Sequence, residues 1–155
     1  MKDHEIAEWL LIADEDVVSA DILDRENNLS NSYYFCSQAV EKYLKSYLFS
    51  NDIKVNKNHN ISQTLWNCIN HNKDFIEIQQ DCNKMTQAVK KIRYPGRMIP
   101  TKEDIKKAFN LIEKIKKLEP IKNLYNNIID KYGEDWKNTL FKKITNVEVN
   151  ISQNN

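Results

Sequence analysis

The sequence predicts an all-α protein folded as a helical bundle, and three observations lead to this prediction. The chain of 155 residues contains only 2 Gly and 3 Pro, so it has few of the residues that tight turns and left-handed backbone require. Apolar residues recur three and four positions apart through most of the chain, which is the period of an amphipathic helix. The 23 basic and 22 acidic residues suit solvated helical faces.

The first two predicted helices are separated by an Asn- and Ser-rich turn over residues 25–32. The first follows an apolar stripe from Ile6 to Leu23, and the second begins near Ser30 or Ser32 and runs to residue 50. Apolar side chains occupy a wide arc of the second helix, so we expect it to be the central and most buried one. Four polar side chains share a narrow strip opposite that arc: Tyr34, Gln38, Glu41 and Lys45.

The remaining helices are predicted from shorter stripes. After a polar loop over 51–60, a short helix carries Ile61, Leu65, Trp66 and Ile69 on its core face, and the next one follows the apolar stripe 78–92 and ends near residue 94, before Pro95. Two prolines and one glycine make 93–100 a stiff loop.

The ends of the later helices are marked by capping residues. Thr101 and Asp104 form a capping box that opens the fifth helix, and Pro120 ends or restarts it. A further helix follows over 121–132, and Gly133 is a suitable C-terminal cap for it.

Composition argues against several classes of protein. Three cysteines without CxxC spacing suggest neither a disulfide framework nor a zinc site, so we expect them to be small buried apolar residues. The three histidines are scattered, and neither a metal nor another cofactor is expected. No apolar stretch approaches the ~20 residues that span a bilayer, and no leader opens the chain, so a cytoplasmic location without a membrane partner is predicted.

The small net charge of +1 hides an asymmetry along the chain. Residues 1–26 carry 9 acids and 2 bases, whereas residues 84–117 carry 11 bases and 3 acids. Such a division either attracts phosphate to one surface or pairs one helix with another, inside the bundle or across a dimer.

Several segments, taken in order, resemble the HEPN family (higher eukaryotes and prokaryotes nucleotide-binding). The second helix contains YYFCSQAVEKYLKSYL, similar to a QQA-x-EK-x-LK helix of that family. HNISQTL resembles its histidine-led third helix, KKIRYPGR its RYP step, and TKEDIKKAFNLIEKI its capped last core helix. The resemblance covers roughly residues 6–118.

The resemblance implies an antiparallel up-and-down bundle of four or five helices, commonly homodimeric. We therefore expect a HEPN-like bundle over 1–118, a C-terminal helical extension packed on it over 119–145, and a flexible tail over 146–155. It also implies one of two activities. Some members are ribonucleases with an arginine followed four to six residues later by histidine, and others bind nucleotide or RNA, often beside a small nucleotidyltransferase.

Arg93 matches the family's arginine, but the following YPGRMIP contains no histidine. Metal-independent RNA cleavage needs a group that exchanges protons near neutral pH, which is the property of histidine. The chain thus resembles the subgroup that lacks the ribonuclease motif, and no catalytic residue is predicted.

Two candidate binding surfaces result. Lys90, Arg93, Tyr94 and Arg97 could hold phosphate, since the planar arginine fork binds its oxygens bidentately; the alternative is that such cations only favour the negative end of a helix dipole. The polar strip on the second helix could hold a base or ribose; the alternative is a solvated face with an ordinary Glu41–Lys45 pair. His59 is a possible further contact, or else a structural residue at a helix start.

We therefore predict a non-catalytic nucleotide- or RNA-binding module that forms homodimers and acts with a small nucleotidyltransferase. A metal-independent ribonuclease of toxin–antitoxin type, using a histidine from elsewhere in the chain, is one alternative. A purely structural or oligomerising bundle is the other.

Overall fold

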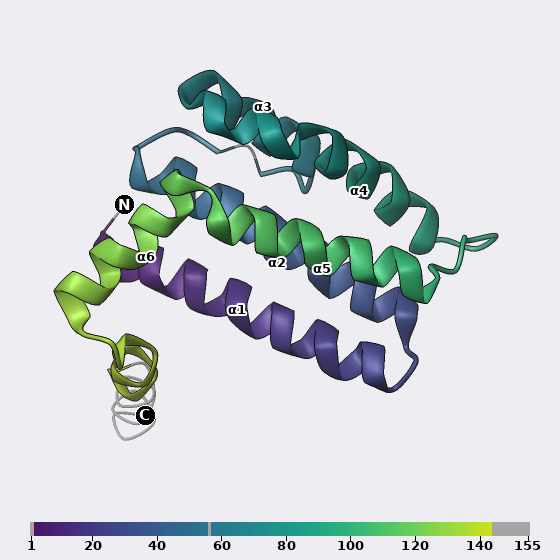
Figure 1. The fold of residues 1–155 in the computed structure, drawn as a ribbon, viewed down its shortest axis with the longest axis horizontal. Helices are drawn as coiled ribbons and strands as arrows, with labels where there is room; N and C mark the ends of the chain where they lie inside the picture. Colours follow the sequence, from purple (N-terminus) through teal and green to yellow (C-terminus); the bar gives the residue numbers. More distant parts are fainter. Residues whose placement is uncertain (1, 56, 144–155) are drawn as a thin grey trace, which may run out of the picture.

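The chain is a bundle of helices, as predicted (Figure 1). A computed structural model describes residues 2–55 and 57–143, and within them no strand occurs. The elements, in order, are α1 (Asp3–Arg25), α2 (Leu29–Ser50), α3 (Ile61–His71), the 3-10 helix η1 (Lys73–Ile78), α4 (Gln79–Ile92), α5 (Lys102–Lys117) and α6 (Glu119–Tyr132). Residues 136–143 are also helical.

The central helix of the bundle is α2, which packs against each of the other labelled α-helices. It runs antiparallel to α1, and α4 and α5 also run antiparallel to each other (Figure 1). By contrast, α2 and α3 run parallel, because Cys68 contacts the Leu44 carbonyl while His71 contacts Tyr47 further along both helices. Residues 51–55 and 57–60 therefore lead back along α2 before α3 begins, as Figure 1 shows.

The core is formed by the apolar stripes that the sequence predicted. On α2 the wide apolar arc is buried, and Tyr43, Leu44 and Leu48 are fully enclosed. The cysteines are also confirmed as buried apolar residues: Cys36, Cys68 and Cys82 are free thiols with no exposed surface.

Capping residues define the ends of the last two helices where the sequence indicated. The Thr101 hydroxyl accepts from the Asp104 backbone N–H, and the Asp104 carboxylate accepts from the Thr101 backbone N–H, which confirms the capping box. Pro120 lies in the first turn of α6. Backbone N–H groups in the first turn have no acceptor within the helix, so a proline there removes no helical hydrogen bond. Gly133 caps α6 with a φ of +86°, a conformation that favours glycine.

In the middle of the chain one prediction was wrong and one element was missed. Trp66, placed on the core face of α3, is 55% exposed, because the buried side of that helix is formed by Ile61, Leu65, Cys68 and Ile69. The 3-10 helix η1 was not predicted, and it turns the chain from α3 into α4 while burying Phe75 and Ile78.

Residues beyond α5 pack onto the bundle through both apolar and polar contacts. Trp136 and Leu140 are buried. The Asp14 carboxylate of α1 accepts hydrogen bonds from Tyr43 of α2 and Tyr125 of α6, and it pairs with Lys137. The division of the chain at residue 118 stays a prediction, and the predicted tail 146–155 lies outside the described residues.

No helix in the described part of the chain combines the length and the apolar character needed to cross a bilayer. The cytoplasmic location stays a prediction.

Candidate functional site

The two candidate surfaces predicted from the sequence meet at one end of the bundle. Arg93 is the C-cap residue of α4, and its guanidinium carbon lies 4.6 Å from the centre of the Tyr34 ring on α2. An arginine over an aromatic face is attracted by the ring quadrupole. The contact therefore places the planar fork of Arg93 on a fixed aromatic surface.

A closed loop follows Arg93. The backbone N–H of Met98 donates to the carbonyl of Lys91 at 3.1 Å, so the chain returns to the end of α4 after only a few residues. Gly96 makes this return possible with a φ of +76°, which other residues rarely adopt. Within the loop, Tyr94 is 67% exposed and Arg97 is also exposed.

In the part of the chain that the structure describes, the cations around this loop have no acidic partner. Among residues 2–55 and 57–143, no ion pair engages Lys90, Arg93 or Arg97. No hydrogen bond or ring contact within the same residues joins Arg93 to Lys90, Tyr94 or Arg97. Their donors are therefore available to an anion.

Some acids of residues 1–26 form ion pairs with bases of residues 84–117 within the chain. Asp24 of α1 pairs with Lys102 of α5 at 2.8 Å, and Asp14 lies 3.5 Å from Lys116. These contacts account for basic residues of α5, whereas the cations near the end of α4 have no such partners in the described chain. The end of α4 and its loop are thus one part of the basic segment whose cations have no acidic partner among the described residues.

The polar strip of α2 differs from a solvated face. Glu41 and Lys45 form an ion pair, but they are only 4% and 7% exposed. The Nδ1 of His59 lies 3.1 Å from the Glu41 carboxylate, which can only accept, so Nδ1 is the donor, and the His59 side chain is 75% exposed. His59 therefore contributes to this side of α2, and the solvated alternative is wrong for Glu41 and Lys45.

His59 and Arg93 both reach the same strip. Arg93 contacts Tyr34 and His59 contacts Glu41, two helical turns further along α2, which corresponds to about 10 Å. Gln38 lies between these two points and is half-buried, with no hydrogen bond to it from the rest of the described residues. The N-cap of α3 is Asn60, so capping does not explain His59.

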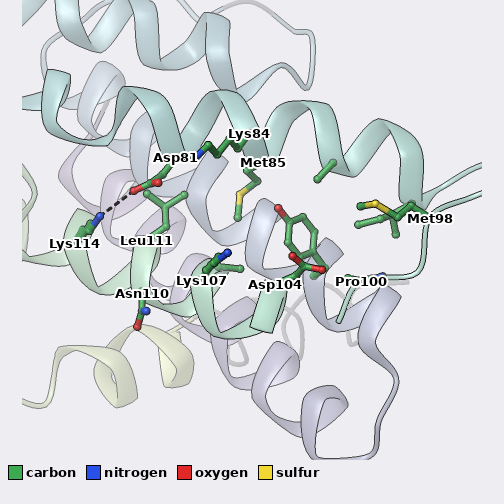
Figure 2. Close-up of a pocket in the computed structure, with 14 residues that line it drawn as sticks. Asp81, Lys84, Met85, Met98, Pro100, Asp104, Lys107, Asn110, Leu111 and Lys114 are labelled. Atoms are coloured by element: carbon green, nitrogen blue, oxygen red, sulfur yellow. Dashed lines mark hydrogen bonds and ion pairs between the residues drawn. The ribbon is translucent and has the colours of Figure 1, made fainter. Parts of the chain in front are cut away.

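A cavity between α4 and α5 was not predicted from the sequence. Its volume is about 410 Å³, within the range of small-molecule pockets. Figure 2 shows Met85 at its centre, Met98 and Pro100 at one end, and the Asp81–Lys114 ion pair, 2.9 Å long, at the other. The only sequence signal was the pair of small residues, Ala88 on α4 and Ala108 on α5, that line it.

In the residues that the structure describes, no group of three or more histidine, cysteine, aspartate or glutamate side chains could hold a metal ion.

The protein is therefore an all-α bundle. At one end it has cationic side chains that lie beside an aromatic residue and form no ion pair with the described residues. The model of the HEPN domain matches residues 6–124, and the chain belongs to this family. Membership indicates a module of nucleotide-binding, RNA-binding or ribonuclease type. Among curated proteins and among solved structures, nothing matches the chain.

Proposed function

We propose that the chain is a non-catalytic module that binds nucleotide or RNA through the loop at the end of α4. The observation that carries this proposal is the Arg93 guanidinium, stacked on Tyr34 and without an acidic partner in the described chain. Lys90 and Arg97 add positive charge on either side of it, and the exposed Tyr94 ring offers a surface on which a base can stack.

The stacking on Tyr34 suits Arg93 to phosphate. A guanidinium that packs its face on a ring keeps the N–H donors at its edge free, and that edge matches two phosphate oxygens. Because the ring and the closed loop restrict the side chain beforehand, less conformational entropy is lost when the ligand binds. Gln38, one turn from Tyr34, is placed to donate or accept at a ribose or base bound along the strip.

The absence of histidine from the residues after Arg93 supports a non-catalytic role. One observation nevertheless favours a ribonuclease as the second candidate: His59 lies on the same strip, where Glu41 orients its ring. In that case Arg93 would stabilise the anionic transition state and His59 would transfer the proton. Incubating a large excess of the protein with labelled single-stranded RNA, beside a His59→Ala variant, distinguishes the two candidates. Cleavage that disappears in the variant would establish the enzyme.

The partner proteins are proposals that rest on family membership. We propose a homodimer and a small nucleotidyltransferase that acts with it. Light scattering at several protein concentrations tests the dimer, and co-expression with a nucleotidyltransferase encoded nearby tests the second partner. A purely oligomerising role predicts instead that salt dissociates the dimer and that nucleotides leave its melting temperature unchanged.

The central test is the salt dependence of RNA binding. The probe is a fluorescent single-stranded RNA of about ten nucleotides. We expect its binding constant K to decrease as salt is added, and the steepness of log K against log salt to decrease by about 0.7 for each phosphate contact that a variant loses. The double variant Arg93→Met, Arg97→Met should therefore lower the slope by about 1.4 and weaken binding.

The matched control for this test is Lys106→Met, Lys117→Met. It removes the same charge from exposed positions of α5 that line neither the loop nor the cavity. ATP and GTP are titrated in parallel. Equal binding by the wild type, the arginine variant and the control would show that Arg93 and Arg97 do not bind phosphate.

A further inference from the structure

The loop after α4 exposes aliphatic side chains for which RNA binding has no use. Residues 93–99 are all exposed, whereas Ile92 and Pro100 at the two ends of the loop are buried. Met98 is 45% exposed and Ile99 is 66% exposed. An aliphatic side chain neither binds phosphate nor offers an aromatic face to a base, so the proposed function does not account for these two residues.

The loop projects from the bundle in a restrained conformation. Figure 1 shows it extending past the ends of α4 and α5. The hydrogen bond from the Met98 backbone N–H to the Lys91 carbonyl closes it, and Pro95 and Pro100 fix two of its φ angles. The exposed apolar side chains are therefore held at the surface before a partner arrives, and little backbone freedom is lost on contact.

Positive charge surrounds these apolar side chains. Residues 84–102 contain 6 bases and no acid. Four of these bases lie near the end of α4 or in the loop, and none of the four forms an ion pair with a residue that the structure describes: Lys90, Lys91, Arg93 and Arg97. The projecting surface thus combines exposed aliphatic groups with cations that are available to a partner.

We infer that the loop docks on the surface of an anionic bilayer, where Met98 and Ile99 enter the apolar layer and the cations bind lipid headgroups. Such a bilayer has negative charge at its surface and hydrocarbon directly beneath it. Long basic side chains reach the headgroups while apolar neighbours lie deeper, and tyrosine, here Tyr94, is favoured at the boundary between the two layers. The loop therefore matches both layers of the bilayer.

Other polyanionic partners match only part of this surface. Single-stranded RNA supplies negative charge but no apolar layer for Met98 and Ile99. A protein partner would have to supply an apolar pocket with an acidic rim in the shape of the loop, whereas a bilayer is fluid and needs no matching shape. The combination of an apolar, projecting loop with unpaired cations therefore favours the bilayer.

The contact is peripheral and needs no spanning helix. The prediction of no membrane partner was based on the lack of a long apolar stretch, which bears only on segments that cross the bilayer. The bilayer contact shares Arg93 and Arg97 with the proposed function. It adds Met98 and Ile99, which have no part in RNA binding, so the two activities can be tested separately.

Co-sedimentation of the full chain with lipid vesicles measures the contact. We expect binding to vesicles of phosphatidylcholine with about 30% phosphatidylglycerol, little binding to phosphatidylcholine alone, and weaker binding as salt is added. Ile99→Trp places a fluorescent indole in the loop. Lipids brominated on their acyl chains should quench this indole more than they quench the tryptophans of the wild type.

Variants at Ile99 test the apolar part of the contact. Ile99→Ser removes an apolar side chain and keeps every cation, so it should weaken vesicle binding about tenfold. Its melting temperature should be unchanged because the side chain is exposed, and Ile99→Leu should bind vesicles as the wild type does. The matched control is Val18→Ser, which removes a similarly exposed β-branched side chain from α1 and should leave vesicle binding unchanged.

The arginine variant tests the cationic part. Each base near an anionic bilayer strengthens binding about fivefold, so Arg93→Met, Arg97→Met should weaken vesicle binding about 25-fold. Lys106→Met, Lys117→Met removes the same charge from α5 and should weaken vesicle binding less.

The outcomes separate this inference from the proposed function. Vesicle binding that Ile99→Ser weakens, with RNA binding kept, supports the bilayer contact. Failure to bind anionic vesicles at low salt overturns it, leaves the RNA site standing and assigns the apolar side chains to a protein partner. Vesicle binding that Ile99→Ser does not weaken, or an Ile99→Trp indole that brominated lipids do not quench, also overturns it, because the contact is then electrostatic only. Loss of RNA binding from the list of activities, with vesicle binding intact, overturns the proposed function alone.

Discussion

The Asp14 carboxylate joins α1 to α2, α5, α6 and the helical residues 136–143, and its removal should be strongly destabilising. It accepts hydrogen bonds from the hydroxyls of Tyr43 at 2.6 Å and Tyr125 at 2.7 Å, and it pairs with Lys116 and Lys137. Asp14→Ala removes all four contacts through one side chain. The variant therefore tests how the C-terminal residues are held on the bundle.

The expected magnitude follows from the exposure of each partner. Tyr43 is fully buried and Tyr125 is half-buried, so each hydroxyl that loses its acceptor should be destabilising by about 1–3 kcal/mol. The side chains of Lys116 and Lys137 are 38% and 47% exposed, so water solvates their ammonium groups in the variant and the loss of these two ion pairs changes the free energy of unfolding little. We expect a decrease of about 2–4 kcal/mol in the free energy of unfolding, or about 5–15 °C in Tm.

Urea denaturation followed by circular dichroism and by tryptophan fluorescence measures this decrease, and the fluorescence includes Trp136 beside Lys137. Asp14→Asn keeps an acceptor for the tyrosines and should lose about 1 kcal/mol. Asp130→Ala is the matched control, since this exposed acid of α6 has no ion pair in the described chain. A loss below 1 kcal/mol in Asp14→Ala would refute the reasoning.

The same carboxylate predicts a pH dependence. Burial by itself would raise the pKa of Asp14, but hydrogen bonds from Lys137, Tyr43 and Tyr125 outweigh it and hold the pKa below its ordinary value of 3.8. A carboxyl whose pKa is lower in the folded state stabilises the protein above the unfolded pKa, and this contribution is lost as the pH falls through the folded pKa. The wild type should therefore lose stability below about pH 4 more steeply than Asp14→Asn.

Three further substitutions give smaller effects. Tyr34→Leu removes the ring beneath Arg93 and should weaken RNA binding about two- to fivefold in fluorescence anisotropy, while Tyr34→Phe should not; equal weakening by both would contradict the stacking. Gly96→Ala meets no atom within 4 Å of the added Cβ, so only its φ of +76° opposes it, and urea denaturation should show a loss of about 1 kcal/mol. Thr101→Ala breaks the capping box and should lose about 1 kcal/mol in the same assay, whereas Thr101→Ser should be near neutral.

Local signals were sufficient to predict most of the helices. The capping box at Thr101, the glycine cap at Gly133 and the long apolar stripes each depend on residues close in sequence, and the structure confirms them. Trp66 was assigned wrongly because it lies next to Leu65 in the sequence, at the edge of the apolar stripe of α3. At such an edge, helical spacing is compatible with a side chain on the buried face or on the exposed face. The helix η1 was missed because a short 3-10 turn has no periodic pattern of its own.

The residues of the candidate site were found in the sequence, but their arrangement was not. The contact between Arg93 and Tyr34, and that between His59 and Glu41, depend on how separate elements pack. A helical pattern shows which residues share a face and leaves open which element covers that face. The cavity was missed for the same reason, because its volume depends on the distance between two helices.

The burial of the Glu41–Lys45 ion pair on α2 has a consequence for the evolution of the protein. Loss of Glu41 alone leaves the enclosed Lys45 ammonium without its carboxylate, which is unfavourable by about 3–5 kcal/mol, and loss of Lys45 alone leaves Glu41 with only the exposed His59 ring as a partner. Replacing both charged residues by apolar ones is often nearly neutral. Mutations at these two positions should therefore be accepted in pairs. Descendants of a common ancestor should retain both charges or neither.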